Sequence, residues 1–167
     1  MKQTFFLVLL VVLCACAQEK PVSSFNKENW NKRSVALDTD SLNLGSSYLS
    51  IYSEIYERNE EGTHLLASTV SMRNISSEDT LYILKASYYD TKGSLIRTYF
   101  DNPVYLLPME TVEIVIDKND RYGGTGANFI FDWASPRASI EPFFEAVMIS
   151  TSSQQGISFT TQGIRRK

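Results

Sequence analysis

LLASTVSMRNISSEDTLYILKASYYDTKGSLIRTYF, residues 65–100, is the stretch that decides the fold of this chain. In its first part apolar and polar side chains alternate, so that three apolar residues share one face of an extended strand: Leu66, Val70 and Met72. The polar segment 74–79 ends this strand, and a second strand is predicted over Leu81–Tyr89. Asp90-Thr91-Lys92-Gly93 has the composition of a tight turn and predicts a hairpin onto Leu95–Phe100. The stretch therefore predicts an antiparallel nucleus of neighbouring strands.

The rest of the chain continues this pattern. Further strands are predicted at Tyr48–Tyr56, Val112–Ile116, Asn128–Trp133, Phe144–Met148 and Ile157–Phe159. No long segment has the 3.6-residue period of an amphipathic helix. With about eight short strands joined by turn signals, the chain is expected to be all-β, an antiparallel immunoglobulin-like β-sandwich, with a small barrel as the alternative. Trp133 is expected to be its best-buried tryptophan.

Composition limits the classes of partner. The 167 residues are 43% hydrophobic and 21% charged, with a net charge of −3, as in an ordinary folded domain. A nucleic-acid-binding domain would carry a clustered basic surface, whereas the basic residues here cluster only at Arg165-Arg166-Lys167. We therefore expect no nucleic-acid partner, and a solvated basic tail over residues 164–167.

The first residues have the layout of a secretory signal. A basic start precedes an uninterrupted apolar run, Phe5–Leu13, which is too short to span a bilayer stably. Leu13-Cys14-Ala15-Cys16 resembles a bacterial lipobox. The resemblance implies removal of residues 1–15 and attachment of acyl chains such as palmitate to Cys16, which would anchor the protein in a membrane. Ala17 after the cysteine favours the outer membrane of the bacterial cell envelope, facing the periplasm or the surface.

Residues 16–47 lack clean periodicity and are rich in Asn, Ser, Lys and Asp, which predicts a flexible tether. The folded β-sandwich domain is then expected at residues 48–163. Phe25 and Trp30 do not suit a tether. They either dock on the domain or rest at the membrane interface, and the sequence leaves both open.

Several segments resemble one family of bacterial envelope proteins, catalogued as domain of unknown function 3124. They are YLSIYSEIY at 48–56, SMRN at 71–74, YYDTKG at 88–93, GGTGANF at 123–129, EAVMI at 145–149 and QGISF at 155–159. The resemblance covers about Tyr48–Gly163, and because the family has no assigned activity it implies no catalytic residues. A similarity to immunoglobulin-like domains of exported lipoproteins concerns the fold alone.

Few residues have the spacing that catalysis or metal binding requires. His64 is the single histidine, and no Gly-x-Ser-x-Gly motif accompanies it. Three neighbours offer oxygen ligands for calcium, but Arg121 and Tyr122 stand where a calcium loop needs a ligand and a glycine: Asp117, Asn119 and Asp120. We therefore expect no catalytic residue, no metal and no cofactor. The alternative is an envelope hydrolase that uses Asp120 and the acidic surface of Glu54–Glu61.

The Gly-rich loop 117–126 gives the partner prediction. Gly123, Gly124 and Gly126 are not followed by the Lys-Ser/Thr of a phosphate loop, so we attribute them to tight chain geometry with positive φ. Loops held by a rigid scaffold carry recognition, and Arg and Tyr dominate binding hot spots. The candidate contacts with an envelope protein partner are Arg121, Tyr122 and Asn128.

These observations predict a membrane-anchored envelope lipoprotein with a non-enzymatic binding or structural role. A subunit of a larger envelope complex is a further possibility, which would show as a contiguous exposed apolar patch.

Overall fold

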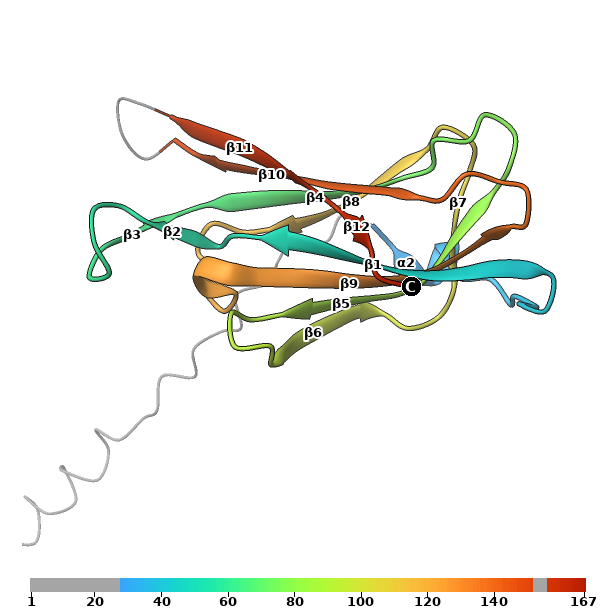
Figure 1. Ribbon diagram of the computed structural model, residues 1–167, viewed down its shortest axis with the longest axis horizontal. Coiled ribbons are helices and arrows are strands. Elements are labelled where there is room, and N and C mark those ends of the chain that lie inside the picture. Colours follow the sequence, from blue (N-terminus) through green and yellow to red (C-terminus); the bar gives the residue numbers. More distant parts are fainter. Residues whose placement is uncertain (1–27, 152–155) are drawn as a thin grey trace, which may run out of the picture.

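The computed structural model describes residues 28–151 and 156–167 as two antiparallel sheets packed face to face (Figure 1). The first sheet has the order β12 (Ile164–Arg165), β1 (Leu42–Ile51), β9 (Ala127–Pro136), β5 (Leu81–Tyr89) and β6 (Leu95–Phe100), and β7 (Val104–Leu106) also pairs with β5. The second sheet has the order β11 (Ile157–Gln162), β10 (Phe143–Ser150), β4 (Ala67–Arg73) and β8 (Thr111–Ile116). This arrangement confirms the predicted antiparallel β-sandwich and is not the closed barrel of the alternative.

Alternation of side chains produces the core between the sheets. β8 alternates strictly between exposed and buried residues, and the inward face of β9 carries Phe129, Phe131 and Trp133, as predicted. Phe131 stacks on Phe144 of β10 with ring centres 4.3 Å apart, which joins the two sheets. Such an aromatic pair contributes about 0.5–1.5 kcal/mol beyond its area burial.

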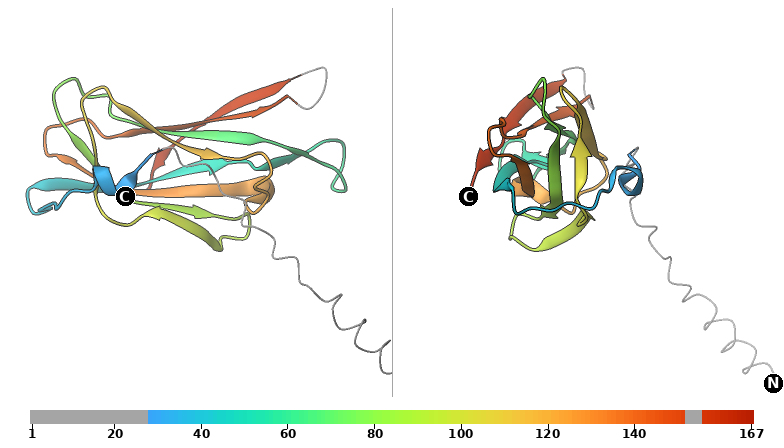
Figure 2. Two further views of the ribbon diagram at one scale, coloured as in Figure 1. Left: turned by 180° about the vertical axis from the view of Figure 1, so that it is seen from behind. Right: turned by 90° about the vertical axis from the view of Figure 1, so that its right-hand side faces the viewer.

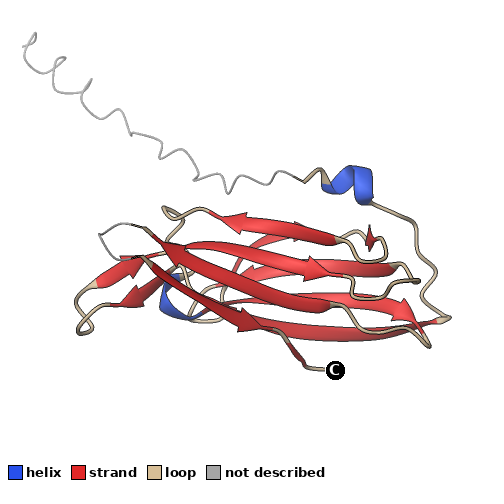
Figure 3. Cartoon of the chain, turned by 90° about the horizontal axis from the view of Figure 1, so that it is seen from above, coloured by secondary structure: helices blue, strands red, loops and turns tan. Residues whose placement is uncertain are grey.

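The chain enters the fold earlier than predicted. The tether was expected to reach residue 47, but a short helix, α2 (Trp30–Arg33), packs beside the sandwich, and β1 begins at Leu42 (Figures 2 and 3). Trp30 docks on the domain, with its ring centre 4.7 Å from that of Phe100, which settles one of the two possibilities left open. The other residue of that question, Phe25, lies outside the described residues.

The first half of β1 escaped prediction because its inward positions are not apolar. Gly45 lies opposite Trp133 across the strand pair, and Ser47 accepts a hydrogen bond of 3.0 Å from the Trp133 indole nitrogen. A large ring therefore fills the space that apolar side chains of β1 would otherwise occupy. Trp133 is 1% exposed, which confirms it as the better buried tryptophan.

The predicted basic tail is also part of the sheet. Ile164 and Arg165 form β12, which pairs with Tyr48 and Ser47 at the edge of the first sheet. The Arg165 guanidinium lies 5.4 Å from the centre of the Trp133 ring and pairs with Glu141. Residues 164–167 are exposed, as predicted, but contacts distant in sequence make Ile164 and Arg165 part of the sheet.

One predicted strand is divided in the structure. The strand expected over Tyr48–Tyr56 stops at Ile51, and the chain continues as a separate hairpin of β2 (Glu54–Tyr56) with β3 (Thr63–Leu65). The buried Ser53 lies at this break. Its carbonyl accepts from the Leu66 amide at 2.9 Å, so the break is bonded to the start of the next strand.

Candidate functional site

The Gly-rich loop lies at one end of the sandwich, held by a buried ion pair. Asp120 is fully buried, and its Oδ2 accepts a hydrogen bond of 2.6 Å from Nη2 of Arg97 on β6. The Arg97 guanidinium lies 5.9 Å from the ring centres of both Tyr88 and Tyr99. Asp120 is therefore an internal anchor of this loop, paired with a cation, and it does not face solvent with the acids of the Glu54–Glu61 surface.

Beneath the loop, two buried hydroxyls meet. Tyr88 and Ser53 share a hydrogen bond of 2.9 Å. Burial is the main cause that raises the pKa of the Tyr88 phenol to about 12, and the bond from Ser53 opposes this rise only in part. Tyr88 is therefore a neutral structural group at physiological pH.

The glycines of the loop serve geometry in two different ways. Gly124 has φ +69°, which fits the prediction of positive φ, whereas Gly123 has φ −68°. A Cβ at Gly123 would overlap the Tyr88 hydroxyl and lie 2.6 Å from Ser53 Oγ. The Gly123 carbonyl also accepts from the amide and the hydroxyl of Thr91, at 3.1 and 3.0 Å, which ties the loop to the β5–β6 turn. Close approach, rather than φ, requires a glycine at residue 123.

The predicted contact residues Arg121 and Tyr122 lie on the outside of this loop. Arg121 Nη2 is 3.1 Å from Oε2 of Glu54, and Thr63 donates to the same oxygen at 2.8 Å. Tyr122 is 60% exposed, while its backbone amide is held by Asp120 at 3.3 Å. The outside of the loop thus carries the exposed ring of Tyr122 and the guanidinium of Arg121, which is paired with Glu54.

Asn128, the third predicted contact, belongs to a different surface. It lies on the outer face of the first sheet, opposite Ser50 on one side and Tyr89 on the other. A groove of about 540 Å³ opens there, lined by Tyr48, Tyr89, Gly93, Asn128, Ile130, Asp132 and Arg166. We call this the sheet groove. Within the described part of the chain, no hydrogen bond or ion pair engages the side-chain ends of Tyr48, Tyr89, Asn128 or Asp132.

Sequence reasoning found Asn128 but missed most of the sheet groove. Strand register alone brings Tyr48 of β1 beside Ile130 of β9, and Tyr89 of β5 beside Asn128. The sequence signal for the groove is the presence of Tyr48 and Tyr89 in two predicted strands, but the sequence does not show which strand lies between them.

The calcium and acid–base candidates do not converge. Asp117 Oδ1 caps the amide of Asn119 at 2.7 Å, while Asp120 faces Arg97. His64 Nδ1 lies 3.4 Å from Oε1 of Glu57, and both residues belong to the β2–β3 hairpin. Across residues 28–151 and 156–167, no group of three or more His, Cys, Asp or Glu side chains is placed to hold a metal ion.

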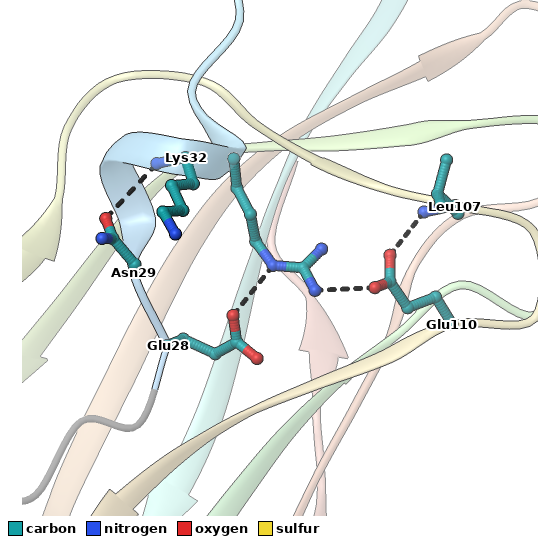
Figure 4. Close-up of polar contacts among 6 residues, drawn as sticks. Glu28, Asn29, Lys32, Leu107 and Glu110 are labelled. Atoms are coloured by element: carbon teal, nitrogen blue, oxygen red, sulfur yellow. Dashed lines mark hydrogen bonds and ion pairs between the residues drawn. The ribbon is translucent and has the colours of Figure 1, made fainter.

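A second polar cluster fastens the beginning of the described chain. We call residues 28–35 the N-terminal clamp. Arg33 donates to Glu28 at 3.0 Å and to Glu110 at 2.7 Å, and the other Glu110 oxygen accepts from the Leu107 amide at 2.8 Å (Figure 4). Burial opposes ionisation of Glu110, but the bonds from Arg33 and Leu107 outweigh it and hold the pKa of this carboxyl below its ordinary value. The clamp continues as Val35 donates to the Pro103 carbonyl at 2.9 Å.

The clamp borders another hollow, of about 590 Å³. Its lining comes from the clamp and from the end of β6 and the loop after it: Glu28, Asn29, Trp30, Asn31, Tyr99, Phe100, Asp101 and Asn102. The predicted lipidation site, Cys16, lies outside the described residues. None of the described helices has the length and apolar composition needed to cross a bilayer.

Comparison with known proteins identifies a family but no activity. No curated protein matches this chain. The crystal structure titled Thermotoga maritima 1070 is similar, with a TM-score of 0.46 and 10% sequence identity, covering 72% of this chain and 92% of that one. The family model described as protein of unknown function (DUF3124) matches residues 45–165. This match spans most of the chain and nearly all of the sandwich, so the protein belongs to the DUF3124 family.

Proposed function

We propose that the protein is a lipid-anchored, non-catalytic binding module of the bacterial cell envelope, and that the sheet groove holds its ligand. Acylation of Cys16 after removal of residues 1–15 supplies the anchor, on the strength of Leu13-Cys14-Ala15-Cys16 and the apolar run before it. Attachment in the outer membrane follows from Ala17 after the cysteine.

The observation that carries the binding role is the set of unpaired polar groups in the sheet groove. Asn128 and Asp132 are half-buried, and their side-chain oxygens and amide have no partner among the described residues. Polar groups that line a groove without internal bonds are free to bond a ligand. The two tyrosines of the groove add flat apolar rings, each with a hydroxyl at the end. This chemistry suits a ligand with many hydroxyl or amide groups and small apolar faces, as a saccharide chain has.

A non-catalytic role is supported by the ion pairs of the acidic residues that were assigned to the alternative hydrolase. Asp120, the residue assigned to the alternative hydrolase, is buried against Arg97, and Glu54 of the acidic surface pairs with Arg121. Neither carboxylate faces the sheet groove, whose lining contains the single acid Asp132 among the described residues. One carboxylate does not provide the pair of acids that glycoside hydrolysis uses.

The test is a titration of the isotopically labelled mature chain, carrying C16S to keep it in solution, with N-acetylglucosamine oligomers and soluble peptidoglycan glycan strands. We expect amide chemical-shift changes in β1, β9 and β5 around the groove. D132A and N128A should abolish these changes, and Y56A, which removes an exposed tyrosine of β2, should keep them. Shifts that map to the Gly-rich loop instead, or no shifts with any glycan, would overturn the assignment of the groove.

A further inference from the structure

Two turns at the end of the sandwich opposite the Gly-rich loop carry exposed apolar side chains. Ile75 lies in the β4–β5 turn, and Leu107 and Met109 lie in the β7–β8 turn; they are 46, 50 and 69% exposed. The turns are bonded to each other, since the Met109 amide donates to the Ser76 carbonyl at 3.0 Å and the Asn74 amide to the Glu110 carbonyl at 2.9 Å. We call these three residues the apolar tip.

Met109 occupies a backbone position that favours another residue type. Its φ is +60°, and Glu110 closes the turn by donating to the Leu107 carbonyl at 3.0 Å. This position follows a proline and is one where glycine or asparagine is favoured. Since the side chain is mostly exposed, the fold gives Met109 no burial that would offset the strain. A contact with another molecule would explain why a methionine occupies this position.

The N-terminal clamp connects this tip to the point where the chain enters the fold. Glu28 binds Arg33, Arg33 binds Glu110, and Glu110 binds the amide of Leu107, so two bridging side chains separate the first described residue from the apolar tip (Figure 4). The first described residue, Glu28, therefore lies in the half of the sandwich that carries the tip.

The length of the upstream chain limits where the domain can lie. Residues 17–27 separate Cys16 from the clamp. Such a segment reaches at most about 40 Å when fully extended. The ten-residue strand β9, by comparison, spans about 33 Å of the sandwich. A lipid at Cys16 would therefore keep the clamp, and with it the neighbouring apolar tip, within about 40 Å of the bilayer.

We propose that the apolar tip enters the interface of the bilayer that anchors Cys16. This inference rests on the lipid anchor of the proposed function. Three apolar side chains alone would bind a membrane weakly, but the tether raises their local concentration at the bilayer, so that a weak insertion suffices. In this orientation the β4–β5 and β7–β8 turns face the bilayer, and the Gly-rich loop at the opposite end of the sandwich faces away from it.

The proposal is tested with the mature chain, residues 16–167, coupled through the Cys16 thiol to a maleimide lipid in phosphatidylcholine vesicles. Chemical coupling replaces biological acylation, so a protein that proves not to be acylated in the cell would remove the proposed anchor without deciding this experiment. Tryptophan is introduced at the tip by M109W or I75W, and at the opposite end by L95W, whose leucine is 54% exposed near the β5–β6 turn. Two tip variants guard against the misfolding of either.

The readout is quenching of the added indole fluorescence by brominated lipids, with the unsubstituted chain as the background. We expect both tip variants to lose a larger fraction of their added fluorescence than L95W. Equal loss at the three positions, or the largest loss in L95W, would overturn the proposal. Absence of quenching in both tip variants would also overturn the proposal, and it would point to a protein partner for the apolar tip instead.

Discussion

The indole of Trp133 lies directly over Gly45, so that a Cβ at residue 45 would fall within 2.6 Å of three of its ring atoms. The two residues face each other across β1 and β9, and the indole nitrogen is bonded to Ser47 two residues along β1. A missing side chain on one strand thus makes the pocket for the largest side chain on the next.

This relationship predicts that Gly45→Ala destabilises the fold by about 1–3 kcal/mol, the usual cost of overpacking a core. Trp133→Ala should cost about 3–5 kcal/mol through loss of a buried aromatic ring. Gly62→Ala is the matched control, because a Cβ there would meet only the end of the Glu57 side chain at 3.8 Å. Urea denaturation measures each change. Equal stability of the G45A and G62A variants would contradict this reading of β1.

Gly123 gives a second prediction, concerning the buried hydroxyls. Gly123→Ala should destabilise the fold by about 1–3 kcal/mol, because the new methyl overlaps the Tyr88 hydroxyl. In a Tyr88→Phe background that hydroxyl is absent, so the same substitution should cost less. A double-mutant cycle from denaturation curves measures this coupling. Strict additivity of the two changes would show that the clash is not the reason for glycine.

Sequence reasoning succeeded where strands have a clear apolar face. The hairpin of Leu81–Tyr89 with Leu95–Phe100 has the bounds that were predicted, and the inward rings of β9 were assigned correctly. Alternation within a strand is a local property, and it can be recognised without knowledge of the neighbouring strands.

It failed where order depends on partners distant in the chain. Arg33 is held by Glu110, 77 residues away, so a segment with tether-like composition is part of the fold. The first half of β1 is not recognisable as a strand in the sequence, because Gly45 and Ser47 are not apolar. Gly45 leaves room for the Trp133 ring of β9, and Ser47 accepts a hydrogen bond from its indole nitrogen. The sheet groove was missed for the same reason, since Asp132 and Arg166 approach Tyr48 only in the folded register.

The clamp gives a prediction about acid stability. The folded-state pKa of Glu110 is lowered, whereas an unfolded glutamate has a pKa of about 4.3. The unfolded state therefore binds the extra proton first. The stabilisation from Glu110 is fully present above the unfolded pKa and is lost as the pH falls through the lower, folded pKa.

Glu110→Gln should accordingly lower the free energy of unfolding at neutral pH and reduce its fall between about pH 5 and the lowered pKa. Denaturation series at several pH values, with the unsubstituted protein beside the variant, give both quantities. If the free energy of unfolding of E110Q falls with decreasing pH as steeply as that of the unsubstituted protein, the Arg33–Glu110 ion pair does not couple folding to protonation.

Both the proposed location of the protein and the proposed insertion of the apolar tip depend on a lipid at Cys16. Intact-mass spectrometry of the protein purified from bacterial membranes tests it most directly. We predict a chain that begins at Cys16 and carries the added mass of acyl groups, and a C16A variant that remains as uncleaved precursor or is missorted. An unmodified mature mass, or a C16A variant with the same mass and the same partition into detergent as the native chain, would contradict the account.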